Sequence, residues 1–170
     1  MEPQVVLVNK RDEAIGVTGK LAAHQQALLH RAFSVFIFNS QHELLLQQRQ
    51  LDKYHCAGLW TNTCCSHPSP DENIILAGER RLREELGILI HLSDAGQFIY
   101  RAEFENGLTE HELDHVLVGH YHDEPYQINT TEIVAVKWMS ITTLKQVLRK
   151  HPEQFTPWLS IALSIAISSL

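Results

Sequence analysis

Apolar and β-branched residues recur along the chain in short runs that are typical of strands. The predicted strands are Val5–Val8, Phe33–Phe38, Leu44–Gln48, Phe98–Phe104, Leu113–Tyr121 and Glu132–Ser140. These runs are spread over the whole length of the chain, and longer segments of helical period lie between them. The pattern therefore predicts a mixed α+β fold.

One helix is well marked between the third and fourth of these runs. Its apolar and small residues recur at helical spacing, at Ile75, Gly78, Leu82 and Leu86. We expect a helix over Asp71–Leu86, with Asp71 as its N-terminal cap and Gly87 as its stop.

Three further segments have helical character. Ser140–Arg149 and Glu153–Ile167 predict two helices late in the chain, separated by Pro152. Gln25–Leu29 is a short helix-like stretch directly before a strand. The apolar tail Trp158–Leu170 has thirteen residues, too few to cross a bilayer as a helix, so we expect it to dock on the protein.

The composition is that of one globular domain spanning residues 1–170. The chain is 44% hydrophobic and 20% charged, with no internal repeat or long linker. Its 14 basic and 20 acidic residues give a formal charge of −6 without a basic run, which argues against a nucleic-acid partner. A small anionic ligand would need a local basic patch or a bridging divalent cation.

The cysteines and the N-terminus indicate a cytoplasmic protein. Cys56, Cys64 and Cys65 are odd in number and two are adjacent, which is unlike a secreted disulfide framework. The N-terminal residues lack the basic region and long apolar stretch of a signal peptide.

Two pairs of reactive side chains have the spacing of neighbours on one face of a strand. Cys65 and His67 are two residues apart, as are Glu110 and Glu112. If both pairs lined one pocket, imidazole and carboxylate could bind a metal while thiol and carboxyl moved protons. For Glu110 and Glu112 alone, a solvated strand edge is the simpler interpretation.

Eleven histidines invite a metal interpretation, but most fall in predicted loops. His24 and His30 flank the stretch Gln25–Leu29, and they could converge if a helix ended between them. Taken alone, either one is as well explained as an exposed or hydrogen-bonded histidine.

The marked helix carries a motif of its own. Its segment Arg83–Gly87 resembles the end of a Nudix box, R-E-U-x-E-E-x-G-U with U aliphatic. In the aligned run Arg80–Ile88, Arg81 stands where the box has a metal-binding glutamate, which argues against hydrolysis. Taken alone, Arg81 and Glu85 predict only an i,i+4 ion pair on a solvated face, worth about 0.2–0.5 kcal/mol.

Several further motifs occur in order around this helix. They are Lys20–His24, His30–Ser34, Gln48–Arg49, Gly58–Asn62, Cys65–Pro68, Glu85–Gly87, Tyr100–Ala102, Glu110–Glu112 and Phe155–Trp158. Together they resemble the type I isopentenyl-diphosphate isomerases over nearly the whole chain. The resemblance implies a Nudix-like mixed β-sheet sandwich flanked by α-helices.

The resemblance also implies a reaction. The family interconverts isopentenyl and dimethylallyl diphosphate by protonation and deprotonation through a tertiary carbocation. The resemblance implies acid/base roles for Cys65 on one face of the substrate and for Glu112 and Tyr100 on the opposite face. The Trp60 ring would stabilise the carbocation. A site that needs thiolate must lower the thiol pKa with nearby positive charge, which a metal and its histidines could supply. Core packing is the simpler role for Trp60.

The implied ligands fall into three sets. One divalent metal, Zn²⁺, Mn²⁺ or Mg²⁺, would bind the three histidines and two glutamates that match the family pattern: His24, His30, His67, Glu110 and Glu112. The diphosphate would meet the four basic residues that match family positions: Lys20, Arg49, Lys53 and Arg81. The substrate-binding residues implied by the resemblance also include Trp60 and Trp158. A second cation, Mg²⁺, would bridge the diphosphate to Glu85.

Two other functional classes stay open at this point. A Nudix hydrolase of a nucleoside diphosphate derivative would share the fold, and a noncatalytic module could bind metal or diphosphate without turnover. The family resemblance favours an isomerase that needs no membrane and is a monomer or weak dimer. This chain departs from the family in the loop Tyr54–Gly58, which lacks the W-P-G of many members, and in the second thiol, Cys64.

Overall fold

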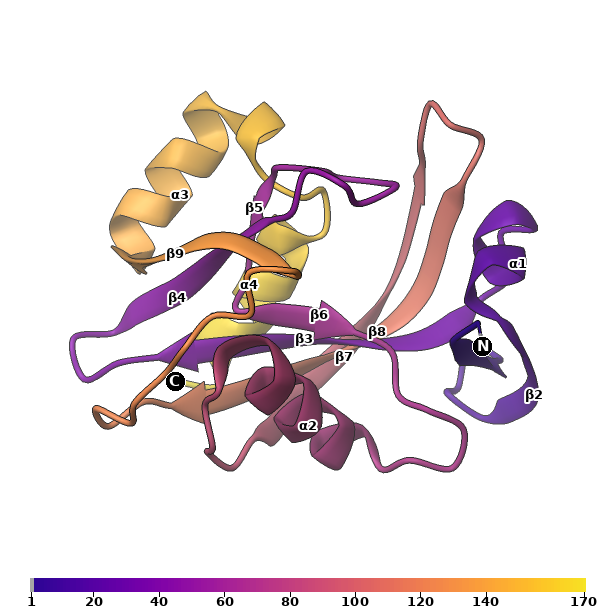
Figure 1. Ribbon diagram of the computed structural model, residues 1–170, viewed down its shortest axis with the longest axis horizontal. Coiled ribbons are helices and arrows are strands. Elements are labelled where there is room, and N and C mark those ends of the chain that lie inside the picture. The colour runs from indigo at the N-terminus through magenta and orange to yellow at the C-terminus, as the bar shows by residue number, and fades with distance from the viewer. Residues whose placement is uncertain (1) are drawn as a thin grey trace.

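The chain folds around a curled mixed sheet with helices on both faces, so the predicted α+β class is confirmed (Figure 1). The computed structural model describes residues 2–170. The strands are β1 Gln4–Val8, β2 Ala14–Gly19, β3 His30–Phe38, β4 Glu43–Arg49, β5 Trp60–Thr61, β6 Cys64–Ser66, β7 Ser93–Glu103, β8 Thr109–His120 and β9 Ile133–Ser140. The helices are α1 Lys20–Gln25, α2 Ile74–Leu86, α3 Ile141–Lys150 and α4 Leu159–Ser168, with a 3₁₀ turn at Pro152–Gln154.

Strand β3 organises the sheet. It pairs in parallel with β8 along its whole length, from His30 opposite Glu112 onward, and antiparallel with β6, where Ser34 lies opposite Cys65. Strand β4 pairs with β9, and β7 extends the sheet beyond β8. The first residues of β3 and β8 and the short strand β6 are therefore side by side.

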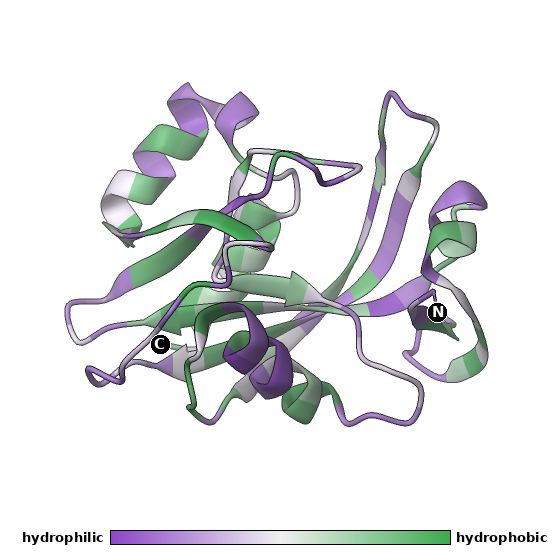
Figure 2. Cartoon of the chain, in the orientation of Figure 1, coloured by the Kyte–Doolittle hydropathy of each residue, from purple (hydrophilic) through white to green (hydrophobic). Residues whose placement is uncertain are grey.

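The sheet has a hydrophobic core on each face, and β3 contributes to both. Val35 and Ile37 pack under α2, whereas Phe36 and Phe38 pack under α3 and α4. A strand that is buried on both faces reads as a continuous apolar run rather than an alternating one. The hydrophobic stretch along the centre of the sheet in Figure 2 follows from this arrangement.

Helix α2 matches the predicted helix except at its cap. Asn73, not Asp71, is the N-terminal cap, and its side chain accepts hydrogen bonds from the backbone N–H groups of Ile75 and Leu76. Asp71 instead lies in the preceding turn with a φ of 65°. The predicted stop is confirmed, because Gly87 has a φ of 68° and closes the helix in the left-handed region.

The early helix-like stretch was wrongly placed. Helix α1 ends at Gln25, and the following residues form a turn in which Ala27 has a φ of 54°. The helix ends between His24 and His30, as their convergence required. The hairpin strand β2 was not predicted, because it is short and mostly exposed, and glycine separates its two alternating β-branched apolar residues, Ile15 and Val17.

The predicted helix Glu153–Ile167 is wrong in its first part. Phe155 forms a β-bridge with Trp60, and the N–H of Thr156 donates to the Trp60 carbonyl at 3.0 Å, so α4 begins only after this contact. The rest of the tail docks as expected, through the buried residues Leu159, Ala162, Leu163 and Ala166. Across residues 2–170, no helix is long and apolar enough to cross a membrane.

Gly78 allows α2 to approach the sheet closely. A Cβ atom there would lie 2.6 Å from Leu117 Cδ1 and 3.0 Å from Leu92 Cδ1, inside a filled core. We expect Gly78→Leu to lower the free energy of unfolding by about 1–3 kcal/mol, because the packed core cannot expand freely. Urea denaturation measures this loss. Gly16→Leu on exposed β2 is the control, and an equal loss there would contradict the explanation.

Candidate active site

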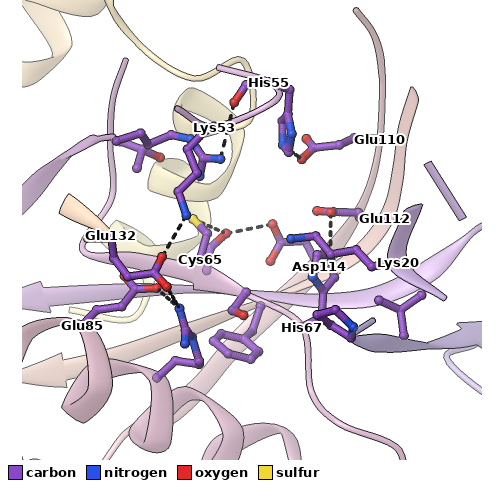
Figure 3. Close-up of a pocket in the computed structure, with 18 of the residues that line it drawn as sticks. Lys20, Lys53, His55, Cys65, His67, Glu85, Glu110, Glu112, Asp114 and Glu132 are labelled. Carbon is purple, nitrogen blue, oxygen red and sulfur yellow. Dashed lines mark hydrogen bonds and ion pairs between the residues drawn. The ribbon is translucent and has the colours of Figure 1, made fainter. Parts of the chain in front are cut away.

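A cavity of about 600 Å³ opens where β3, β6 and β8 begin, between α1, α2 and the loop after β4 (Figure 3). Ten of the residues predicted from sequence line it: Lys20, Arg49, Lys53, Cys65, His67, Arg81, Glu85, Glu110, Glu112 and Trp158. Both same-face pairs face this one cavity, as their spacing predicted. They come from β8 and from β6 together with the residue after it.

A compact group of metal-ligating side chains lies at one end of the cavity. Ligand atoms of His24, His30, His67 and Glu112 all lie within 4.8 Å of one another. His24 Nδ1 is 2.7 Å from the Lys20 carbonyl and His30 Nδ1 is 2.8 Å from the Leu28 carbonyl. A carbonyl accepts only, so both rings carry a proton on Nδ1 and turn Nε2 toward the group.

The contacts within this group are those of a site built for a cation. His30 Nε2 and His67 Nε2 face each other at 3.2 Å, and His67 Nε2 is 3.0 Å from Glu112 Oε1. The Nε2 atom of His24 is buried without a hydrogen-bond partner among the described residues. Three imidazole nitrogens and a carboxylate oxygen that converge in this way fit a divalent metal.

Electrostatics support the same interpretation. Burial lowers the pKa of His67 to about 4, so its ring is neutral and able to ligate. Burial acts to raise the pKa of Glu112, but hydrogen bonds from His30 and His67 outweigh it and hold that pKa well below its usual range. The group thus combines an ionised carboxylate with at least one neutral imidazole.

Glu110 lies beside this group rather than in it. Its Oε1 is 2.5 Å from His55 Nε2, and its Oε2 is buried without a partner in the described chain. Burial and the charge of Glu112 raise the pKa of Glu110. The structure therefore brings four of the five predicted metal ligands together. It also places His55, which sequence reasoning missed, against the fifth, Glu110.

The Cys65 thiol lies among polar side chains on the wall of the cavity. Its Sγ donates to Asn62 Oδ1 at 3.1 Å and lies 3.7 Å from Ser34 Oγ, and Ser34 in turn donates to Asp114 Oδ2 at 2.8 Å. Burial and the nearby Asp114 raise the pKa of Cys65 to about 12. Among the protein's own groups, burial and Asp114 thus favour the thiol form of Cys65.

Tyr100 and Trp158 form an aromatic pair near Glu112 and Cys65. Tyr100 lies opposite Glu112 in the β7–β8 pairing, which places both side chains on the same face of the sheet. Its hydroxyl is buried without a partner in the described part of the chain, and its ring is 6.1 Å from that of Trp158. The Trp158 Nε1–H donates to Asn62 Oδ1 at 3.2 Å, on the same oxygen that accepts from Cys65.

Residues 28–159 match the family model of the NUDIX domain. The chain is 48% identical to isopentenyl-diphosphate Delta-isomerase 2 from Aromatoleum aromaticum, over 99% of this chain and 88% of that protein. It is 47% identical to the isopentenyl-diphosphate Delta-isomerase of Pectobacterium atrosepticum, over 95% and 89% of the two chains. The chain belongs to the isopentenyl-diphosphate Delta-isomerase family. A solved structure from Deinococcus radiodurans, 20% identical with a TM-score of 0.72 over 95% and 96% of the chains, shares the fold.

In this member of the isomerase family, several basic residues line the same cavity as the metal-ligating group. Burial and the positive charges of Lys53 and Arg49 lower the pKa of Lys20, so three cations are crowded together. The Nε atoms of Arg49 and Arg81 are buried without partners among residues 2–170. Crowded cations and unsatisfied donors fit an anionic group such as a diphosphate.

Arg81 also differs from the solvated ion pair that its spacing predicted. Its Nη2 lies 2.7 Å from Glu85 Oε1, but Glu85 is only 4% exposed and accepts a second hydrogen bond from Gln47. Glu132, which sequence reasoning missed, binds Lys53 Nζ at 2.8 Å and lies 3.6 Å from Arg81. The cations Lys53 and Arg81 are thus held by the buried Glu85 and the half-buried Glu132.

Trp60 is not among the residues that line the cavity, whereas Trp158 is. Trp60 packs against the core under α4, and Lys137 Nζ lies 4.0 Å from the centre of its ring. A role of Trp60 toward a carbocation stays a prediction.

Proposed function

We propose that this chain interconverts isopentenyl diphosphate and dimethylallyl diphosphate. The observation that carries the proposal is one cavity lined by the Cys65 thiol, by members of a metal-ligating group that includes the Glu112 carboxylate, and by several cations. The reaction needs a proton added to the terminal alkene carbon and a proton removed from the carbon on the other side of the double bond. Membership of the isomerase family supports the same reaction.

Cys65 and Glu112 are the acid/base pair of the proposed mechanism. Cys65 holds its proton as a thiol, because burial disfavours the thiolate, while Glu112 is ionised and hydrogen-bonded to two histidines. One group can therefore give a proton and the other can take one. The Tyr100 hydroxyl, buried without a partner in the part of the chain described, is free to hydrogen-bond either group or the substrate.

Trp158 is the residue suited to tolerate the carbocation. Its ring lines the cavity and is 4% exposed, and an aromatic face attracts a cation by about 0.5–2 kcal/mol without forming a bond to it. The hydrogen bond from its Nε1 to Asn62 fixes the ring beside the thiol. Water would capture a carbocation, so a buried aromatic wall also protects the intermediate.

Two metal ions complete the proposed site. His24, His30, His67 and Glu112, with Glu110 alongside, would hold one divalent ion, Zn²⁺, Mn²⁺ or Mg²⁺, and Glu85 would hold a Mg²⁺ that bridges to the diphosphate. When bound, these ions supply positive charge that offsets the carboxylates and the diphosphate. Hydrogen bonds to the backbone orient the rings of His24 and His30, and a hydrogen bond from Gln47 orients Glu85.

Arg49 is expected to bind the diphosphate. Arg49→Met should raise KM for isopentenyl diphosphate about 10- to 100-fold with a smaller change in kcat, because it removes a charge-assisted hydrogen bond worth about 1.5–3 kcal/mol. Steady-state kinetics measure the change. Lys137→Met is a matched control, since both cations lie over a tryptophan ring but Lys137 covers Trp60 outside the cavity. Equal KM values in Arg49→Met and the parent would contradict the assignment.

Exchange in heavy water tests the function itself. The protein is incubated with isopentenyl diphosphate and Mg²⁺ in D₂O, and the products are followed by NMR. We expect dimethylallyl diphosphate with deuterium in the new methyl group, and no release of phosphate. Phosphate release without exchange would instead establish a hydrolase. Arg81 makes that outcome unexpected, because it stands where a Nudix box carries a metal-binding glutamate.

A further inference from the structure

His55 and Glu110 form a buried pair whose geometry selects one oxygen of the carboxylate. His55 is 9% exposed and Glu110 is 4% exposed, and the imidazole Nε2 lies against Oε1 at 2.5 Å. A carboxylate only accepts hydrogen bonds, so Nε2 is the donor. The second oxygen, Oε2, has no partner in the described structure and remains available.

We propose that His55 is a positioning residue that holds Glu110 so that its free oxygen faces the metal-ligating group. The inference deepens the metal site of the proposed function and rests on it. Glu110 lies two residues before Glu112 on the same face of β8, next to the four converged ligands. Without His55, its carboxylate would lack this donor and could turn away from the ion.

The surroundings of His55 fix its ring in place. The ring packs against Tyr54 at 4.7 Å, Phe104 at 5.2 Å and the metal-group residue His24 at 5.8 Å between centroids. The Asn106 side chain donates to the Tyr54 carbonyl at 2.6 Å, which ties the loop after β4 to the β7–β8 hairpin. This contact fixes the loop that carries His55 relative to the hairpin whose strand β8 carries Glu110.

His55 also connects the cationic end of the cavity with the end that holds the metal-ligating group. Arg49, at the cationic end, lies with its Nη2 3.5 Å from the His55 carbonyl, while the His55 side chain holds Glu110 at the metal end. Partners that orient a metal ligand typically change metal affinity by 10- to 100-fold when they are removed. The His55 ring is therefore expected to contribute to metal binding through Glu110.

The proposal is tested by measuring the metal affinity of two variants at His55. His55→Leu removes the donor at similar size, and His55→Gln keeps an N–H that can reach Glu110. We expect equilibrium dialysis with Mn²⁺ and with Zn²⁺ to show about 10- to 100-fold weaker binding for His55→Leu and a Kd within about threefold of the parent for His55→Gln. His91→Leu, at an exposed position, is the control for loss of an imidazole.

The outcomes separate this inference from the proposed function. Parent-like affinity in His55→Leu, or equal weakening in both variants, would overturn the positioning role, and so would a parent protein that binds neither ion. Metal binding by the parent without isomerisation would overturn the function alone. Thermal unfolding of the metal-free variants checks that the fold is kept, and rescue by glutamine is a result that a packing role would not give.

Discussion

Replacing Cys65 with alanine should lower kcat for isomerisation by about 10²–10⁴-fold, the usual contribution of a positioned acid or base. The thiol is held between Asn62 and Ser34, and a methyl group at this place can neither give nor take a proton. Metal content should stay unchanged, because Cys65 is not part of the ligand group formed by the three histidines and Glu112. Steady-state kinetics and metal analysis of one preparation measure both effects.

Cys64→Ala is the matched control for this variant. Cys64 is the neighbouring residue on β6, and its side chain is buried in the core under α2 instead of facing the cavity. We expect its removal to cost some stability while turnover stays within a few-fold of the parent. Near-normal turnover in Cys65→Ala, or equal loss in both variants, would remove Cys65 from the acid/base pair.

The sequence predicted those parts of the site that follow from strand period. Cys65 with His67, and Glu110 with Glu112, share a face because alternate residues of an extended segment must do so. Register then places Glu112 opposite His30 on β3 and opposite Tyr100 on β7. Local geometry thus indicated which residues could meet.

The parts that sequence did not predict depend on loops and on tertiary pairing. His55 lies in an irregular loop that is positioned by a contact with Asn106, fifty-two residues from Tyr54. Glu132 precedes β9 and reaches Lys53 only because β9 pairs with β4. No periodic pattern marks either residue. Asp114 was different, because it continues the alternation of Glu110 and Glu112 and could have been found.

The thiol also shows why a reactive group cannot be assigned a protonation state from its neighbours in sequence. His67 is two residues away, but burial and Asp114, which is far away in the sequence, dominate the pKa of Cys65. Likewise, Trp60 lies in the expected motif, but it packs against Lys137 and the core and is not among the residues that line the cavity, whereas Trp158 is. Burial and long-range contacts decide both cases.

Glu112→Gln should lose both metal and activity. Glu112 belongs to the ligand group and accepts from His67 at 3.0 Å, and a neutral amide is a weaker ligand that cannot accept a proton in the reaction. We expect metal affinity to fall by at least about 10- to 100-fold, the usual effect of removing even an indirect partner. At saturating metal, kcat should still fall by about 10²–10⁴-fold, because the base is absent.

Two measurements separate the two roles of Glu112. Equilibrium dialysis gives the metal affinity, and kinetics across a range of metal concentrations show whether turnover recovers when the site is refilled. Glu103→Gln makes the same chemical change at an exposed residue of neighbouring β7 and should leave both unchanged. Full recovery of kcat at high metal would assign Glu112 to metal binding alone. Retained metal with lost turnover would assign it to proton transfer alone, so the dual role requires both losses.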